Sequence, residues 1–145
     1  MKPVFALLSA TVLILAISCS KNGITTKPRI VIKDYTATVL PGGSLVISMD
    51  YFDKEGDLDS IFGNKMRFNT DPEILPNQYL ADTFNYPLMV QTAKNQGEIA
   101  FQLEYSLLNE QPVFNDTIKF KFYVKDRAGN VSDTIITNQI VAINE

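Results

Sequence analysis

The sequence of 145 residues has no histidine and no tryptophan, and its single cysteine is Cys19. Without histidine, the chain cannot form the serine–histidine or cysteine–histidine pairs that activate catalytic nucleophiles. Zinc likewise loses its most common ligands. A formal net charge of −3 and the lack of a basic patch argue against a nucleic-acid partner. We therefore expect a protein that is not an enzyme and does not bind nucleic acid.

Long apolar runs are also absent, except near the start of the chain. Lys2 precedes an uncharged stretch from Val4 to Ile17, which is typical of a secretory signal and shorter than the ~20 residues of a membrane-spanning helix. Ala16 and Ser18 are small residues just before the cysteine. We expect residues 1–18 to be a cleaved signal peptide.

The stretch "LAISC" at residues 15–19 resembles a bacterial lipobox, whose cysteine is lipidated and becomes the mature N-terminus. The lipobox leucine usually lies three positions before the cysteine, whereas Leu15 lies four before it, and a type I signal peptidase could cut the same bond. We favour lipidation of Cys19, because an unpaired thiol has little use in an oxidising compartment. The resemblance implies a membrane partner through the lipid and a location in the cell envelope at the outer membrane. The polar, patternless stretch that follows predicts a flexible tether, so that residues 19–27 form the lipidated N-terminus and tether.

From residue 28 onward, apolar residues recur at every second position, which indicates half-buried strands rather than helices. The clearest patterns cover residues 44–51, 98–107 and 117–125, and weaker ones cover 29–40, 65–69, 86–91 and 131–143. About seven strands separated by glycine and proline turns predict an all-β fold, a single antiparallel immunoglobulin-like β-sandwich over residues 28–145. An open or closed barrel is the alternative.

An acidic stretch, "FDKEGDLDS" at residues 52–60, follows the candidate strand at 44–51. In the expected sandwich, the loop after the strand at 117–125 lies at the same end. Carboxylates at close range raise one another's pKa unless a cation lies among them. Calcium is the simplest candidate cofactor, because it accepts many oxygen ligands in irregular geometry. The candidate metal ligands are Asp53, Glu55, Asp57, Asp59 and Asp126.

The acidic stretch does not have the spacing of an EF-hand. A metal-free interpretation therefore stays open, in which the acids are solvated and Lys54, Lys65 or Arg127 balances their charge.

The stretch "YVKDRAGNVSDTI" at residues 123–135 resembles the last two strands of bacterial immunoglobulin-like repeats. Together with "YFDKEGDLDS" and the lipobox, it resembles small Bacteroidota-type surface lipoproteins of largely unassigned function. The patterns "DSI" and "DTI" also resemble the Asp-Ser/Thr-aliphatic acceptor for O-glycosylation in such bacteria. That resemblance implies candidate modification at Ser60, Thr117 and Thr134.

The longest irregular segments, residues 70–86 and 108–116, are expected at the end of the sandwich opposite the acidic stretch. Loops on a rigid sandwich often carry binding, and exposed aromatic residues are typical anchors. The candidate partner-binding residues are Leu75, Tyr79, Phe84 and Phe114. The alternative is that these side chains fold back over the core.

The leading expectation for function is a membrane-anchored, non-catalytic lipoprotein that binds or scaffolds an envelope protein or glycan and is stabilised by calcium. A structural accessory subunit of a larger outer-membrane assembly is the alternative. A minimal hydrolase that uses Asp53 with Glu55 or Asp57 has less support, because nothing in the sequence fixes the carboxylate separation or the sugar cleft that it requires.

Overall fold

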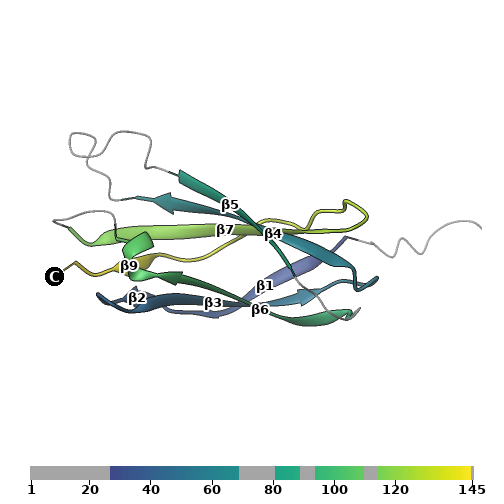
Figure 1. Ribbon diagram of the computed structural model, residues 1–145, viewed down its shortest axis with the longest axis horizontal. Helices are drawn as coiled ribbons and strands as arrows, with labels where there is room; N and C mark the ends of the chain where they lie inside the picture. Colours follow the sequence, from purple (N-terminus) through teal and green to yellow (C-terminus); the bar gives the residue numbers. More distant parts are fainter. Residues whose placement is uncertain (1–26, 69–80, 89–93, 110–113, 145) are drawn as a thin grey trace, which may run out of the picture.

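The computed structural model describes residues 27–68, 81–88, 94–109 and 114–144. Within these ranges the chain forms strands, and its only regular helix is one 3₁₀ turn, η2 (Tyr105–Leu107). Two sheets pack face to face, so the expected all-β sandwich is confirmed (Figure 1). The immunoglobulin-like assignment stays a prediction. No helix in the described part of the chain has the length and apolar character needed to cross a membrane.

The smaller sheet has the strand order β1-β3-β6, and its neighbouring strands are antiparallel. These strands are β1 (Arg29–Tyr35), β3 (Ser44–Phe52) and β6 (Gln96–Glu104). The larger sheet has the order β2-β9-β7-β4-β5, and β8 also pairs with β7. Its strands are β2 (Thr38–Val39), β4 (Leu58–Arg67), β5 (Ala81–Pro87), β7 (Asp116–Asp126), β8 (Ile135–Ile136) and β9 (Ile140–Ala142).

The core lies between the sheets and follows the period-two pattern of the sequence. In β7, Ile118, Phe120, Phe122 and Val124 have no exposed surface, whereas the lysines between them are partly exposed. The apolar side chains of β3 face β7 from the other sheet in the same alternation. Each fully buried side chain of this size contributes about 1.5–3 kcal/mol, so the facing surfaces of β3 and β7 are the main source of stability.

Two predicted strands are each divided into two short strands, and only the first of them changes sheets. The segment 29–40, predicted as one strand, is divided into β1 in the smaller sheet and β2 in the larger, after a register shift between Ile32 and Asp34. The segment 131–143 is divided into β8 and β9. Ser132 lies before β8, and Thr137 lies between β8 and β9. The hydroxyl of each accepts a hydrogen bond from a β7 backbone N–H group at 3.0 Å. Side-chain acceptors thus replace part of the strand ladder.

Three other boundaries also differ from the predictions. The strand predicted at 65–69 begins at Leu58, because buried Leu58 and Ile61 continue its inner face into the acidic stretch. The strand predicted at 86–91 lies at 81–87 and pairs with β4, while residues 89–91 lie outside the described part of the chain. The pattern at 98–107 ends in η2, and this helical turn exposes Leu107 and buries Leu108.

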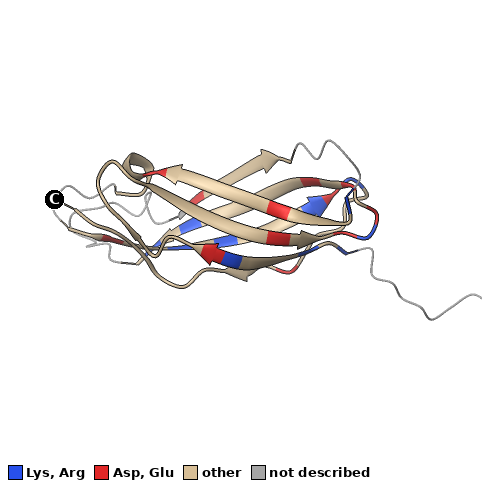
Figure 2. Cartoon of the chain, turned by 90° about the horizontal axis from the view of Figure 1, so that it is seen from below, with Lys and Arg blue, Asp and Glu red and all other residues tan. Residues whose placement is uncertain are grey.

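Different turns and chain segments lie at the two ends of the sandwich (Figure 1). Arg29 pairs with Phe52, so β1 starts beside the end of β3 and the acidic stretch. We call this the entry end; it holds the turns 53–57 and 126–130, where acidic and basic residues gather (Figure 2). The C-terminus and η2 lie at the opposite end, which we call the far end.

A close approach in the larger sheet explains one glycine. A Cβ atom at Gly63 in β4 would lie 2.0 Å from the ring of Phe84 on the neighbouring strand β5. The ring lies over the glycine and stacks on Phe101 of the smaller sheet, with 4.9 Å between ring centroids. Gly63 is therefore the residue that lets Phe84 cover the core.

We expect Gly63→Ala to destabilise the protein by ~1–3 kcal/mol, because the added methyl group displaces the Phe84 ring. Denaturant unfolding measures this change. In a Phe84→Ala background the same substitution should cost less than about 0.5 kcal/mol, since the ring is gone. An equal cost in both backgrounds would show that the ring is not the reason for the glycine.

Candidate functional site

Three acidic side chains meet at the entry end. Asp53, Asp57 and Asp126 each offer one carboxylate oxygen, and these three atoms lie within 4.8 Å of one another. We call this group the acidic triad. It combines the acidic stretch with the turn after β7, as the sequence analysis expected. The other two candidate ligands, Glu55 and Asp59, are exposed and lie outside the triad.

The first turn is held together by its own side chain. One oxygen of Asp53, Oδ2, accepts a hydrogen bond from the Asp57 N–H at 2.7 Å, and the Gly56 N–H donates to the Asp53 carbonyl at 3.3 Å. Gly56 has φ = 68°, a left-handed conformation in which glycine has no steric penalty. The sequence Asp-x-x-Gly-Asp therefore folds back so that both aspartates face the same point.

The second turn repeats this arrangement with an asparagine. The Asp126 carboxylate accepts hydrogen bonds from both the backbone N–H and the side-chain Nδ2 of Asn130, each at 2.7 Å. Gly129 has φ = 92°. The Arg127 N–H donates to the Asp57 carbonyl at 3.1 Å and so joins this turn to the first.

Two members of the triad are buried, Asp57 is half-buried, and no described cation compensates their charge. Asp53 and Asp126 are each 2% exposed, and no lysine or arginine of the described residues forms an ion pair with any triad member. The Oδ1 atoms of Asp53 and Asp57 are buried and have no hydrogen-bond partner within the described ranges. Burial raises the pKa of Asp53, the nearby charges of Asp57, Asp126 and Glu55 raise it further, and the Asp57 N–H opposes them. A bound cation would offset both the burial of the Asp53 charge and its repulsion by the neighbouring carboxylates.

The candidate modification sites differ in their accessibility. Ser60 lies in β4 and is buried, and Thr117 is half-buried in β7. Thr134 is exposed and lies just before β8. Of the three, Thr134 is therefore the hydroxyl that the folded chain presents to solvent.

The candidate partner-binding residues also differ in their burial. Phe84, which we expected in an exposed loop, lies in β5 and packs against the core, because β5 covers residues that the sequence marked as irregular. Phe114 is 54% exposed at the far end. Leu75 and Tyr79 lie outside the described residues.

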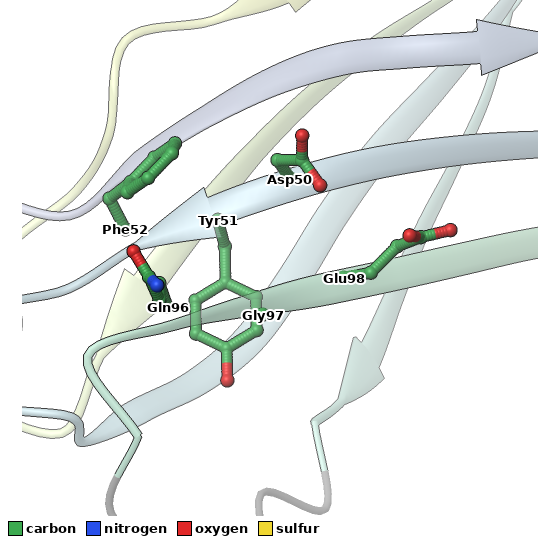
Figure 3. Close-up of a pocket in the computed structure, with 6 residues that line it drawn as sticks. All are labelled: Asp50, Tyr51, Phe52, Gln96, Gly97 and Glu98. Atoms are coloured by element: carbon green, nitrogen blue, oxygen red, sulfur yellow. The ribbon is translucent and has the colours of Figure 1, made fainter.

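A shallow hollow of about 380 Å³ lies where β3 and β6 pair near the entry end, lined by residues that include Asp50 and Glu98 (Figure 3). Both carboxylates face Lys33, whose Nζ lies 2.6 Å from Glu98 and 3.9 Å from Asp50. The hydrogen bond and charge of Lys33 lower the pKa of Glu98, and Glu98 in turn raises the pKa of Lys33. Lys33 thus stabilises the charged form of Glu98, which disfavours Glu98 as a general acid.

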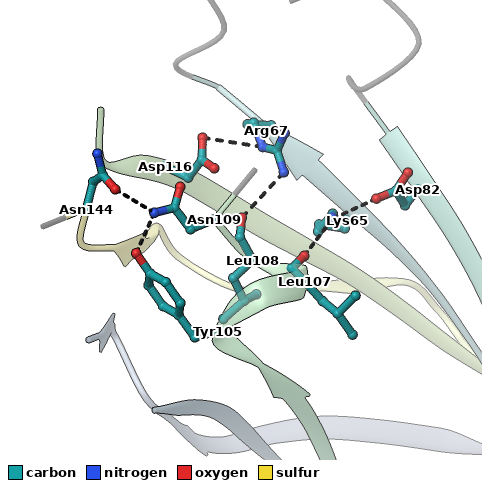
Figure 4. A network of polar contacts seen from close by, with 9 residues as sticks. All are labelled: Lys65, Arg67, Asp82, Tyr105, Leu107, Leu108, Asn109, Asp116 and Asn144. Atoms are coloured by element: carbon teal, nitrogen blue, oxygen red, sulfur yellow. Dashed lines mark hydrogen bonds and ion pairs between the residues drawn. The ribbon is translucent and has the colours of Figure 1, made fainter. Parts of the chain in front are cut away.

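A second set of buried charges, which the sequence analysis missed, lies at the far end (Figure 4). Arg67 and Asp116, whose side chains have no exposed surface, form an ion pair at 3.5 Å. Arg67 also donates to the Leu108 carbonyl at 3.4 Å. Lys65 binds Asp82 at 2.7 Å and the Leu107 carbonyl at 2.9 Å.

The signal for these residues was the strand alternation itself. Lys65 and Arg67 have the same parity as buried Ile61, and Asp116 has the same parity as buried Ile118. A charge at an inward position of a strand indicates a buried partner. These residues connect β4 and β7 to the segment after β6, so we assign the network a structural role.

No protein-family model and no curated protein sequence matches the chain. Among solved structures, the sporulation control protein Spo0M from Bacillus subtilis matches with 8% identity and a TM-score of 0.42 over 82% of this chain and 49% of that chain. A β-glucosidase from Listeria innocua, in complex with gluconolactone, matches with 10% identity and a TM-score of 0.44 over 83% of this chain and 16% of that chain. The chain thus spans about half and about a sixth of these proteins. These likenesses are too weak to assign a family or a function.

Asp116→Asn should destabilise the protein by ~3–5 kcal/mol, because it removes the negative charge of the buried ion pair that Asp116 forms with Arg67. Glu98→Gln is the matched control: it removes an ion pair whose two side chains are about half exposed, and it should cost ~1 kcal/mol or less. Urea unfolding of both variants gives the comparison. Similar small losses in the two variants would contradict the structural role of the far-end network.

Proposed function

We propose that the chain is a membrane-anchored, non-catalytic lipoprotein whose β-sandwich binds or scaffolds another component of the cell envelope, at the outer membrane. The observation that carries the proposal is the position of the first strand. Arg29 pairs with Phe52, so the sandwich is entered beside the acidic triad. A lipid on Cys19, followed by a tether of at most ~25 Å over residues 20–27, would hold the entry end toward the membrane and the far end away from it.

The carboxylate geometry favours binding or scaffolding over hydrolysis. Of the residues that a hydrolase would use, Asp53 is buried within the triad, whereas Glu55 points to solvent outside it. The hollow of Figure 3 contains two carboxylates, but both are paired with Lys33. The first place lacks an accessible carboxylate pair, and in the second Lys33 lowers the pKa of Glu98, whereas glycoside hydrolysis requires one carboxyl group as a general acid.

The far end has the features of a contact surface. Four large apolar side chains are more than half exposed close to strand ends or η2 on this side: Leu40, Phe68, Leu107 and Phe114. Exposed apolar groups that cluster on one end commonly mark an interaction site. The partner is an envelope protein or a glycan. An accessory subunit of an outer-membrane assembly would use the same end.

Cys19→Ser should release the protein from the membrane or leave the precursor uncleaved, because the acyl chains attach to the Cys19 thiol. Membrane fractionation and mass spectrometry of the mature N-terminus measure this. Ser20→Ala, the neighbouring control, should fractionate like the wild type. A Cys19→Ser protein that stays with membranes, together with a native N-terminus without acyl mass, would contradict the anchor.

Phe114→Ala should reduce capture of the envelope partner at least tenfold while changing stability by less than ~1 kcal/mol, because the side chain is mostly exposed. Phe84→Ala is the control from the core and should cost ~3 kcal/mol or more but keep the partner. Cross-linking and pull-down from the native envelope, followed by thermal unfolding, measures both effects. Full capture by Phe114→Ala would remove this side chain from the binding surface.

A further inference from the structure

The acidic triad contains more negative charge than its turns need. Both oxygens of Asp126 accept from Asn130, but the hydrogen bond of the first turn requires only one side-chain oxygen at Asp53, and none at Asp57. Asparagine supplies such an acceptor without a charge. Nevertheless three carboxylates converge within 4.8 Å, and two of them are 98% buried. Buried carboxylates without a partner are costly, so this arrangement points to a positive ligand.

Two oxygen atoms of the triad are buried without a hydrogen-bond partner among the described residues. Asp53 Oδ1 and Asp57 Oδ1 are buried and accept no hydrogen bond from the described residues. Their neighbours Glu55 and Asp59 face solvent instead. Two of the four acids of the turn are thus directed inward and two face solvent. A loop whose acids were merely solvated would have no need to turn any of them inward.

The donor set is specific for a hard cation. All three ligands are carboxylates, and the chain has no histidine, so zinc and other metals that prefer nitrogen or sulfur are disfavoured. Oxygens bound to one calcium ion at ~2.3–2.6 Å lie up to about 5 Å apart, which agrees with the spread of the triad. Magnesium demands ~2.0–2.1 Å and a nearly ideal octahedron, and it usually keeps several waters. Partly buried ligands from two separate turns suit calcium better.

We propose that Asp53, Asp57 and Asp126 bind one calcium ion, which joins the two sheets at the entry end. Asp53 follows β3 of the smaller sheet, whereas Asp57 precedes β4 and Asp126 ends β7 in the larger sheet. The ion therefore cross-links the two layers and adds to the backbone bond between Arg127 and Asp57. Calcium outside the cytoplasm would hold this end of the sandwich closed.

The full mature chain, purified in detergent and freed of metal with EGTA, provides the test. Calorimetric titration with calcium chloride should give one bound ion per chain. Millimolar calcium should raise the melting temperature by roughly 5–10 °C relative to EGTA, because the ion binds the native state and not the unfolded chain. Magnesium chloride at the same concentration should give less than half of that shift.

Variants locate the site. Asp57→Asn and Asp126→Asn should each abolish most of the calcium shift, whereas Glu55→Gln and Asp59→Asn remove the same charge from the same stretch and should keep it. In EGTA, Asp57→Asn should melt at or above the wild-type temperature, because it relieves repulsion within the triad and the Asp57 Oδ1 atom accepts no hydrogen bond. This expected stability keeps the variant folded.

Three results would overturn the proposal: no heat of binding and an unchanged melting curve, an equal shift with magnesium, or an equal loss of the shift in Glu55→Gln and Asp57→Asn. The test is independent of the lipid anchor. The released Cys19→Ser protein should show the same calcium shift, so failure of one proposal does not decide the other.

Discussion

Four phenylalanine rings between the sheets determine how the rest of the molecule is arranged. Phe84 of β5, Phe101 of β6, and Phe120 and Phe122 of β7 lie with ring centroids 4.9–6.4 Å apart. They connect the smaller sheet to the centre and the edge of the larger one. Because aromatic rings pack in few relative orientations, this cluster fixes the position of one sheet against the other. That position in turn decides which loops meet at each end.

The two ends of the sandwich differ in whether their buried charges have partners of opposite sign among the described residues. At the far end, the charges are compensated within the chain: Arg67 faces Asp116, and Lys65 faces Asp82. At the entry end, three carboxylates converge and no described cation of the chain pairs with them. A buried charge either pairs with an opposite charge or becomes neutral, which for a carboxylate means gaining a proton. The described charges at the far end thus have partners within the chain, whereas the described residues supply no cation to the acidic triad.

The parts of the fold that could be predicted are those in which local pattern and burial agree. The alternation over residues 117–125 reproduced the inner face of β7, because its inward positions are all large and apolar. The strand from Leu58 to Arg67 was mostly missed, since glycine and basic residues occupy inward positions of that strand. The sequence around Phe84 predicts a loop for a similar reason: the burial of its ring depends on the space above Gly63, which lies on another strand.

The candidate site shows the same division. The sequence alone determined that a histidine-free chain has carboxylates, not imidazoles, to offer a cation, and it predicted that the acidic stretch and Asp126 lie at the same end of a sandwich. Only the tertiary structure decided that Asp53, Asp57 and Asp126 converge while Glu55 and Asp59 do not. The physical reason lies in the turn: the left-handed conformation of Gly56 and the hydrogen bond from the Asp57 N–H to Asp53 set the direction of each side chain. The directions of these side chains cannot be derived from the spacing of the acids along the sequence.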